Sequence, residues 1–338
     1  MKKVSIKDIA RSAGVSIALV SYVLNGKEKQ ARIGKEIAAT IKRKAKELNY
    51  QPNQIAKSLK TGKTQTIGLI VADISNPFFA NIARTIEDEA KKSNYTVIFG
   101  SSDESSEKLA NLIRVFLERQ VDGFIIAPTE NSKNHIKNII ELGKPVVLID
   151  RYFSNIGSSY VVTDNFEASY KVVKHIMDTG HNNIAMVAYN TKLIHIQYRI
   201  KGYEKAIKES NSALQKSIVK KINFDSIEEE VGVAIDELMT MKPKVDAIFF
   251  ATNTLALYGI KALTKRKHKI PADCAVACFD KGDAFDFFYS PLTFIDQPLE
   301  EEGKVAVQVL INRLNNPSAK PQQIILQSKL VIRESSGA

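Results

Sequence analysis

The apolar side chains of the first fifty residues recur at the spacing of amphipathic helices. Three segments carry this pattern, with inward positions expected at Ile6, Ile9, Ala10 and Ala13, then at Val20, Val23 and Leu24, and then at Ile37, Ile41, Ala45 and Leu48. The third helix is expected from about Lys35 to Leu48. Three such helices suffice for a small hydrophobic core, so this region predicts a helical unit of its own.

The polar residues between these segments supply the helix ends. Ser5 can cap the first helix, and Asp8, three residues later, completes a capping-box pattern. Gly14 permits a tight turn with a left-handed backbone. Ser16 can cap the second helix, which an Asn-Gly pair ends. Two short helices joined by such a turn predict a helix-turn-helix.

From residue 66 onward, short β-branched runs alternate with helical patterns. Strands are expected at 67–72, 95–100, 123–127, 146–149 and 160–162, and in a second series at 184–188, 218–221, 247–250, 276–279 and 293–295. Helices are expected between them at about 79–93, 108–119, 167–179, 198–210, 227–241 and 254–266. This alternation is typical of βαβ units and parallel sheets covered by helices. The two series predict two Rossmann-like lobes.

Polar side chains fall where these strands end, and open parallel sheets bind ligands outside the carboxyl ends of their strands. The side chains concerned are Asp73, Asn76, Asp150, Arg151, Asp164, Asn165, Arg199, Asn253, Asp280 and Gln297, with Phe78, Phe79 and Phe224 beside them. Carboxylates, amides and guanidinium groups framed by phenyl rings suit a polyhydroxylated ligand, because each hydroxyl group both donates and accepts hydrogen bonds. We expect that ligand in the cleft between the lobes.

Length and charge sharpen this picture. A chain of 338 residues is long enough for two or three folded units. Its net charge of +11 lies entirely in residues 1–63, which hold 15 basic and four acidic residues, whereas the rest of the chain is neutral. A helical unit that carries all of the excess charge is an electrostatic footprint for a polyanion such as nucleic acid.

Several function classes find no support in the residues. The chain has neither the roughly 20 apolar residues of a membrane helix nor a signal-peptide pattern near its start, so we expect a cytoplasmic, nucleoid-associated protein with no membrane partner. The histidines lack metal-binding spacing, and no G-x-S-x-G or G-x-G-x-x-G motif occurs. We therefore expect no catalytic residue, metal or cofactor. Cys274 and Cys278 are expected to be small buried side chains.

Several motifs together resemble the lactose repressor (LacI/GalR) family. The helical unit carries Ser5-Ile6-Lys7-Asp8-Ile9-Ala10, Ala13-Gly14-Val15-Ser16 and Val23-Leu24-Asn25-Gly26, followed by Leu48-Asn49-Tyr50-Gln51-Pro52-Asn53 and Ile55-Ala56-Lys57-Ser58-Leu59. The remainder carries Thr66-Ile67-Gly68-Leu69-Ile70 and Ile74-Ser75-Asn76-Pro77-Phe78-Phe79. The similarity covers effectively the whole chain.

The resemblance implies a sequence-specific repressor of transcription, acting as a homodimer, whose affinity for double-stranded operator DNA is controlled by a small-molecule effector, a sugar. It implies a helix-turn-helix domain at 1–50, a hinge helix and linker at 51–63, and an effector-binding and dimerisation domain at 64–338. The last would have the periplasmic-binding-protein fold, with lobe one at about 64–161 and 296–324 and lobe two at about 162–293 and 325–333.

In this family the second helix enters the major groove of DNA. The DNA contacts implied for this chain are Ser5, Ser16, Ile17, Ala18, Ser21, Tyr22 and Asn25, and in the hinge Asn53, Ala56, Leu59 and Lys60. Leu59 would act as an apolar wedge in the minor groove. The chain departs from the family at Leu19, where Thr is common, and at Tyr22, where Arg or His is common.

The effector contacts implied by the same resemblance are Asn76, Phe78, Phe79, Asp150, Arg151, Arg199, Phe224, Asn253, Asp280 and Gln297, to which the strand-end position adds Asp73. Thr254 stands where the family frequently has Asp. Two other function classes fit parts of the chain. A solute-binding protein fits the two lobes alone, and the basic helical unit argues against it. A Rossmann-fold sugar-metabolising enzyme is disfavoured by the missing cofactor fingerprint.

Overall fold

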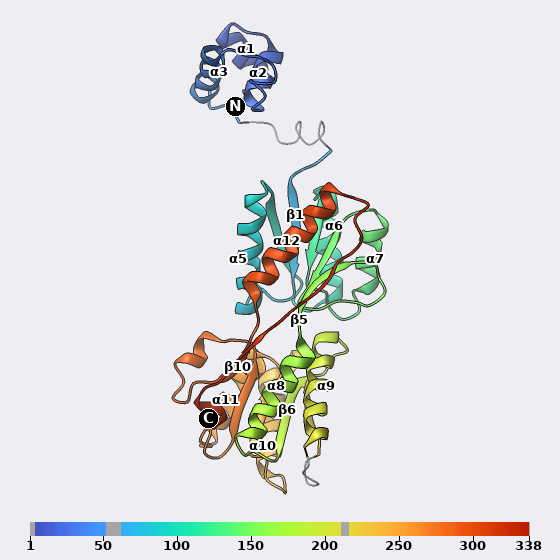
Figure 1. Cartoon of the computed structure of the whole chain (residues 1–338), viewed down its shortest axis with the longest axis vertical. Coiled ribbons are helices and arrows are strands. Elements are labelled where there is room, and N and C mark those ends of the chain that lie inside the picture. Colours follow the sequence, from blue (N-terminus) through green and yellow to red (C-terminus); the bar gives the residue numbers. More distant parts are fainter. Residues whose placement is uncertain (1–3, 52–61, 211–215, 338) are drawn as a thin grey trace. The chain divides into compact units, whose positions relative to one another are not determined.

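The computed structural model describes residues 4–51, 62–210 and 216–337. It divides the chain into two compact units, residues 1–64 and residues 65–338, which we call the head and the body (Figure 1). The head is helical and the body is built from strands and helices in alternation. The boundary falls one residue from the expected start of the body.

The head consists of the helices α1 (Ile6–Ala13), α2 (Ile17–Leu24) and α3 (Lys35–Glu47). The Asp8 carboxylate accepts a hydrogen bond of 2.9 Å from the Ser5 backbone N–H at the start of α1. The Ser16 hydroxyl oxygen accepts one of 3.2 Å from the Leu19 N–H at the start of α2. Gly14 between them has a φ of +65°, as the tight turn requires.

The core of the head is formed by one side of each helix. Ile9, Val20 and Ile41 are fully buried there. The expectation for Ile37 is wrong, because this side chain is 45% exposed and Ala38 is buried instead. In α3 the residues 38, 41 and 45 share the inward face by their spacing of three and four, and Ile37 falls outside it.

Lobe one of the body is a parallel six-stranded sheet in the order β11-β5-β4-β3-β1-β2. Its strands are β1 (Thr66–Val71), β2 (Thr96–Ser101), β3 (Gly123–Ile126), β4 (Val146–Ile149), β5 (Ser159–Thr163) and β11 (Gln323–Leu326). Its helices are α5 (Pro77–Lys92), α6 (Ser106–Glu118), α7 (Lys133–Glu141) and α12 (Leu299–Asn315). Sequence patterns had not indicated α7 or α12, and α12 packs side by side with α5 (Figure 1).

Lobe two repeats this plan with the strand order β12-β10-β9-β8-β6-β7, in which β12 alone is antiparallel. Its strands are β6 (Ile184–Tyr189), β7 (Ile218–Ile222), β8 (Ala247–Phe250), β9 (Ala275–Phe279), β10 (Thr293–Asp296) and β12 (Lys329–Val331). Its helices are α8 (Asn165–Asp178), α9 (Ile194–Glu209), α10 (Ile227–Thr240) and α11 (Asn253–Lys265), with 3-10 turns η1 (Phe224–Ser226), η2 (Asp283–Asp286) and η3 (Glu334–Ser336).

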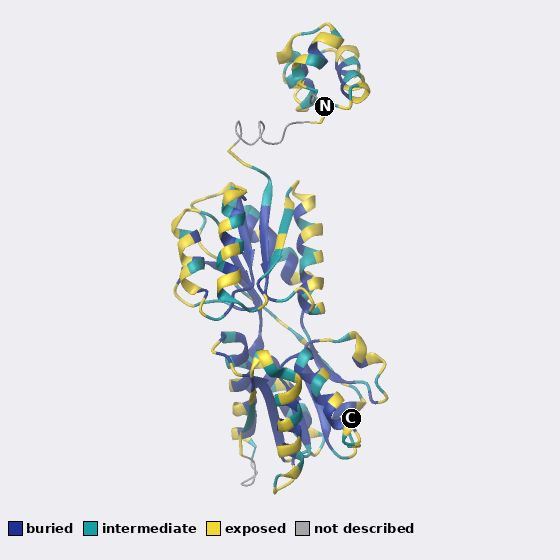
Figure 2. Ribbon diagram, turned by 180° about the vertical axis from the view of Figure 1, so that it is seen from behind, coloured by how far each residue is buried: buried dark blue, intermediate teal, exposed yellow. Residues whose placement is uncertain are grey.

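The central strands of both sheets are buried between helical layers and are dark in Figure 2, whereas the edge strands β2, β7, β11 and β12 are partly exposed. Cys274 and Cys278 are fully buried, as expected. Purely parallel strands need this cover on both faces, and their near-continuous apolar runs meet that need. The same cover leaves only the strand ends free to present polar side chains.

The chain passes between the lobes three times, after β5, after β10 and between β11 and β12. Two of these crossings are fastened together, because the Asp164 carboxylate accepts hydrogen bonds of 2.9 Å and 2.7 Å from the N–H and hydroxyl of Ser328. The tail then joins lobe two, where the buried Ser335 hydroxyl donates to the Val276 carbonyl. The C-terminal segment therefore completes both lobes.

Candidate functional site

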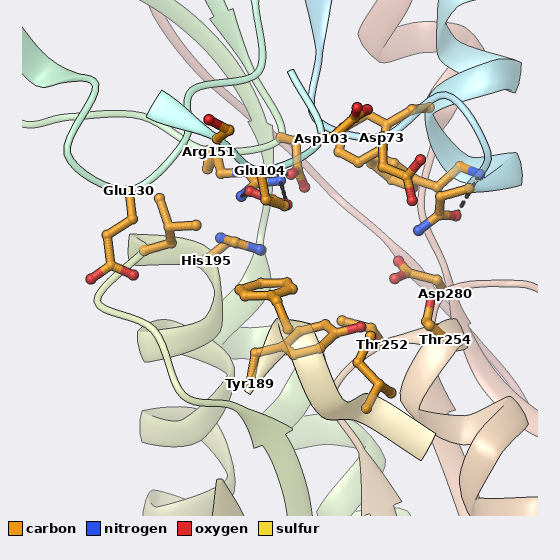
Figure 3. A pocket seen from close by; sticks show the side chains of 18 of the residues that line it. Asp73, Asp103, Glu104, Glu130, Arg151, Tyr189, His195, Thr252, Thr254 and Asp280 are labelled. Carbon is orange, nitrogen blue, oxygen red and sulfur yellow. Dashed lines mark hydrogen bonds and ion pairs between the residues drawn. The ribbon is translucent and has the colours of Figure 1, made fainter. Parts of the chain in front are cut away.

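A cavity of about 670 Å³ lies between the lobes, where the carboxyl ends of both sheets face each other (Figure 3). Nine of the side chains expected from the sequence line it, namely Asp73, Asn76, Phe78, Phe79, Asp150, Arg151, Arg199, Phe224 and Asp280. The rule that parallel sheets bind at their strand ends therefore brings most of the expected side chains to one cavity, although other residues form more than half of its wall.

The first part of the wall is fixed by the start of α5. Asn76 caps this helix, and its Oδ1 accepts a hydrogen bond of 3.0 Å from the Phe78 N–H. Phe78 and Phe79 then follow as an edge-to-face pair with ring centroids 4.9 Å apart. Their rings give the cavity an apolar side that can lie against the carbon face of a ligand.

Arg151 is held rigidly by two carboxylates of lobe one. Its Nε donates to Asp150 at 3.0 Å, and its two terminal nitrogens donate to the Glu104 carboxylate at 3.0 Å and 2.8 Å. Burial lowers the pKa of Arg151, but Glu104 and Asp150 outweigh burial and raise it overall. Asp150 has a φ of +62°, an uncommon conformation that the surrounding contacts maintain.

Arg199 is the largest fully buried side chain of lobe two, at 1% exposure. Its Nε donates to Asn165 Oδ1 at 2.7 Å, and Nη1 donates to the Ala251 carbonyl at 2.7 Å and lies 3.6 Å from Asp280. We expected Arg199 to open its helix, but α9 begins at Ile194 and holds Arg199 in its interior. Part of its guanidinium therefore joins lobe-two elements together, although it also lines the cavity.

Asn253 and Gln297 were expected to contact the ligand, but they lie behind the cavity wall. Gln297 Nε2 donates to the Asp280 carboxylate, and Asn253 Nδ2 donates to Asn76 Oδ1 at 3.2 Å. Each therefore orients a residue that does line the cavity. Burial raises the pKa of Asp280, and Arg199 and Gln297 offset part of that rise.

The cavity also holds side chains that the sequence patterns did not indicate. They are Asp103, Glu104, Ser105, Ser106, Glu130, Asn131, Tyr189, Leu193, His195, Asp225, Ile227, Thr252 and Thr254. Tyr189 ends β6 and stacks on Phe224 with centroids 4.0 Å apart, so the same strand-end rule could have found it. His195 lies one turn before Arg199, and burial together with Arg151 and Arg199 holds its pKa well below the usual range.

Within the described ranges, hydrogen bonds connect the lobes across this cavity at two places. On lobe one, the Glu130 carboxylate accepts from the Thr191 hydroxyl and, at 3.3 Å, from the Lys192 N–H of lobe two. The other contact is the one between Asn76 and Asn253. The separation of the lobes therefore depends on residues at the ligand site.

Glu302 of α12 stands directly behind the wall and is fully buried. Its Oε1 accepts a hydrogen bond of 2.8 Å from the Asp150 N–H, and among the described residues its Oε2 has no partner. Burial, with the charge of Asp150 nearby, raises the pKa of Glu302 to about 8. Glu302 therefore holds Asp150 in place while keeping its own proton at neutral pH.

The head presents a second candidate site on α2. Ile17, Ala18 and Tyr22 are exposed, as the resemblance implies. Ser5, Ser16 and Asn25 are at the helix ends, and the Asn25 amide donates to the Ser21 carbonyl at 2.7 Å. The hinge residues Asn53, Ala56, Leu59 and Lys60 lie outside the described residues.

The described parts of the chain contain no group of His, Cys, Asp and Glu side chains arranged to hold a metal ion. Within the same parts, no helix combines the length and the apolar character of a membrane span.

Two family models match the chain, one for each unit. Residues 5–53 match the model described as bacterial regulatory proteins, lacI family. Residues 64–334 match the model described as periplasmic binding proteins and sugar binding domain of LacI family. The match of the second model alone covers well over half of the chain.

Comparison with individual proteins gives the same family. The ribose operon repressor of Haemophilus influenzae is 31% identical over 98% of this chain and 98% of its own length. A LacI family transcriptional regulator from Enterococcus faecium, crystallised with bound ribose, is 30% identical with a TM-score of 0.71, over 80% of this chain and 98% of that one. The lac repressor dimer bound to operator and the anti-inducer ONPF shares the fold, with a TM-score of 0.85 at 20% identity over 99% of both chains.

Glu302 is expected to make the folded chain less stable as the pH rises. The unfolded chain releases this proton near the ordinary pKa of 4.5, whereas the folded chain keeps it up to about 8. Between these values the unfolded state binds fewer protons, so the free energy of unfolding decreases with rising pH. His195 acts in the opposite direction below its ordinary pKa of 6.5, because the folded chain keeps it neutral there. The effect of Glu302 is therefore measured above that pH, where thermal unfolding followed by circular dichroism up to about pH 8 should show a falling midpoint.

The control is Glu302→Gln, whose amide oxygen still accepts from the Asp150 N–H but which does not titrate. Its unfolding midpoint should fall less steeply than that of the wild type over the same pH range. Equal slopes in the two proteins would show that Glu302 is ionised in the folded state.

Proposed function

Because the chain belongs to the LacI family of bacterial transcriptional regulators, we propose that it represses transcription by binding an operator through its head, and that a sugar in the interlobe cavity controls this binding. The relatives reported above are named as transcriptional regulators, two of them as repressors. We propose no catalytic step and no cofactor for this chain. Its place of action is then the cytoplasm, on the DNA.

One observation carries the DNA-binding part of this proposal. The helix-turn-helix head holds the whole net charge of the chain, and its second helix is exposed along one side. Basic side chains neutralise DNA phosphates and position a helix in the major groove, where base edges are read. A solute-binding protein has no use for such a unit.

The head should account for DNA affinity, and that affinity should fall steeply with salt. If a dimer contacts about 6–10 phosphates, a plot of log K against log salt concentration has a slope of roughly −5 to −9, because each contact releases condensed counterions. Fluorescence anisotropy measures this slope with a DNA duplex taken from the region upstream of the gene that encodes this chain. A fragment starting at Gln65 that bound the same duplex as tightly would refute the assignment.

The cavity supports an uncharged, polyhydroxylated effector. Seven carboxylates line it, and they are those of Asp73, Asp103, Glu104, Glu130, Asp150, Asp225 and Asp280. The two guanidinium groups, Arg151 and Arg199, are already paired with Glu104, Asp150 and Asp280. A phosphate or carboxylate on the ligand would meet net negative charge, whereas hydroxyl groups can donate to these oxygens and stack a ring face on Phe224.

The relatives point the same way. One is named for a ribose operon and another was crystallised with ribose. A pentose or hexose is small enough to bury most of its surface in a cavity of about 670 Å³. We therefore propose a free monosaccharide as the effector class.

Phe224→Ala should weaken sugar binding by roughly tenfold, or about 1.4 kcal/mol. The Phe224 ring stacks on Tyr189 at the floor of the cavity, and a sugar loses its apolar contact when the ring is removed. The probe is whichever uncharged monosaccharide most raises the unfolding temperature in a panel that pairs each sugar with its phosphate ester. Isothermal titration then gives the dissociation constants.

The matched control for this measurement is Phe288→Ala. Phe288 is also a partly buried lobe-two ring paired with a tyrosine, at 4.4 Å from Tyr289, but it does not line the cavity. The Phe288→Ala variant should bind the sugar with the dissociation constant of the wild type. Equal losses in both variants, or a stronger response to the phosphate esters, would contradict the proposed site.

We also propose that the chain acts as a homodimer, since one head contacts too few bases and a palindromic operator needs two-fold symmetry. Large apolar side chains are exposed on the body at Phe99, Leu257, Phe287 and Tyr289, with Phe287 at 90%. The helices α5 and α11 lie on the same side of the body in Figure 1. Exposed apolar side chains that gather on one side of a protein are typical of an interface, whereas isolated ones are not.

Phe287→Asp should shift the chain from dimer to monomer at micromolar concentration. A charge in an apolar interface is costly to bury, and Phe287 makes too little contact within its own chain to affect folding. Sedimentation velocity measures the change. Val233→Asp, at a 52% exposed position on α10, is the matched control and should remain dimeric. A wild-type chain that sediments as a monomer, with and without DNA, would exclude the homodimer.

A further inference from the structure

The exposed side of α2 is unusually apolar for a helix that reads DNA. Its eight residues, Ile-Ala-Leu-Val-Ser-Tyr-Val-Leu, include no charged side chain and no amide. Val20 and Val23 are buried in the head, whereas Ile17 and Tyr22 are each 47% exposed and Ala18 is exposed beside them. The head therefore offers an apolar surface where direct base contacts are expected.

The polar groups around α2 are used within the head itself. The Ser16 hydroxyl oxygen accepts from the Leu19 N–H at 3.2 Å and caps the helix. The Asn25 amide donates to the Ser21 carbonyl at 2.7 Å and to the Ser21 hydroxyl oxygen at 3.4 Å. A bidentate amide contact to adenine or a guanidinium contact to guanine is therefore not available from this helix.

Basic residues lie on either side of α2 in the sequence, not within it. Arg11 precedes α2, and Lys27, Lys29 and Arg32 follow it, all four being exposed. Side chains of this kind contact phosphates, which set the position of the helix without reading the sequence. Base contacts made by α2 itself then fall to its exposed side chains, which are Ile17, Ala18 and the one hydroxyl group of Tyr22.

We propose that Ile17 and Ala18 read the operator by contacting thymine methyl groups in the major groove, so that thymines at the contacted positions select the half-site. The C5 methyl of thymine is the apolar group that a base pair presents in that groove, and it matches an exposed aliphatic side chain. Burying one such carbon against Ile17 excludes water from both surfaces. This inference rests on the DNA binding proposed above and adds the chemistry of recognition to it.

The test compares two duplexes that differ only in methyl groups. Full-length protein first selects a preferred duplex from a random-sequence library. In a second duplex each thymine of the selected half-sites is replaced by uracil, which pairs identically but lacks the methyl. The wild type should bind the uracil duplex more weakly, by about fourfold for each contacted thymine, as expected for one buried carbon. Uracil at flanking positions should change nothing.

Two variants assign the effect to its residues. Ile17→Ala removes most of the exposed apolar contact, so it should bind the thymine duplex more weakly and respond less to uracil than the wild type. Arg32→Ala, the matched control, should weaken binding to both duplexes by the same factor. Far-ultraviolet circular dichroism establishes that both variants fold.

Each result has a definite meaning. Equal affinity of the wild type for the two duplexes would overturn the methyl readout. A sequence preference that survives uracil but disappears in Tyr22→Phe would assign recognition to the Tyr22 hydroxyl and would also overturn it. If the library yields no preferred sequence at all, the operator-binding function fails, and not merely the way in which bases are read.

Discussion

Two arginines and three acidic side chains are buried together where the lobes meet, and the geometry of the cavity depends on how they neutralise one another. Arg151, Arg199 and Glu302 are each at most 2% exposed, and Asp150 and Asp280 are also buried. A buried charge without a partner costs several kcal/mol, so each of these groups either pairs with its neighbours or keeps its proton. Asp150 and Asp280, each at the end of a strand, both have positive φ values, an uncommon conformation that persists only where the surrounding contacts fix it.

This cluster also explains how one cavity can serve two lobes. Glu104, Asp150 and Arg151 belong to lobe one, and Arg199 with Asp280 belongs to lobe two. Glu302 reaches the cluster from α12, which packs on α5 at the outside of lobe one. A ligand that bridges the lobes changes their separation only as far as it binds one arrangement better than the other. The contacts from Glu130 to Thr191 and from Asn76 to Asn253 join the lobes directly and contribute to that balance.

The position of a residue at the end of a parallel strand predicts some of the cavity-lining side chains and misplaces others. Asp73, Asp150 and Asp280 directly follow strands and line the cavity as expected, because the chain direction fixes which end of a parallel strand carries the site. Gln297 and Asn253 follow strands as well, yet each is turned toward a neighbouring side chain of the wall. Glu302 lies more than a hundred residues from Asp150 on a helix that the patterns did not indicate, so no local signal could have connected the two.

The sequence by itself determined the two-unit organisation, the helix caps of the head, the alternation of strands and helices, and the concentration of positive charge in residues 1–63. These features follow from local spacing and composition, which act over a few residues. Only the tertiary structure decided that Ile37 faces solvent, that Arg199 lies inside its helix, and that Glu302 supports Asp150. Such features depend on which distant segments of the chain pack together in the buried interior. Hydrophobic periodicity shows which face of an element is buried but not which segment packs against it.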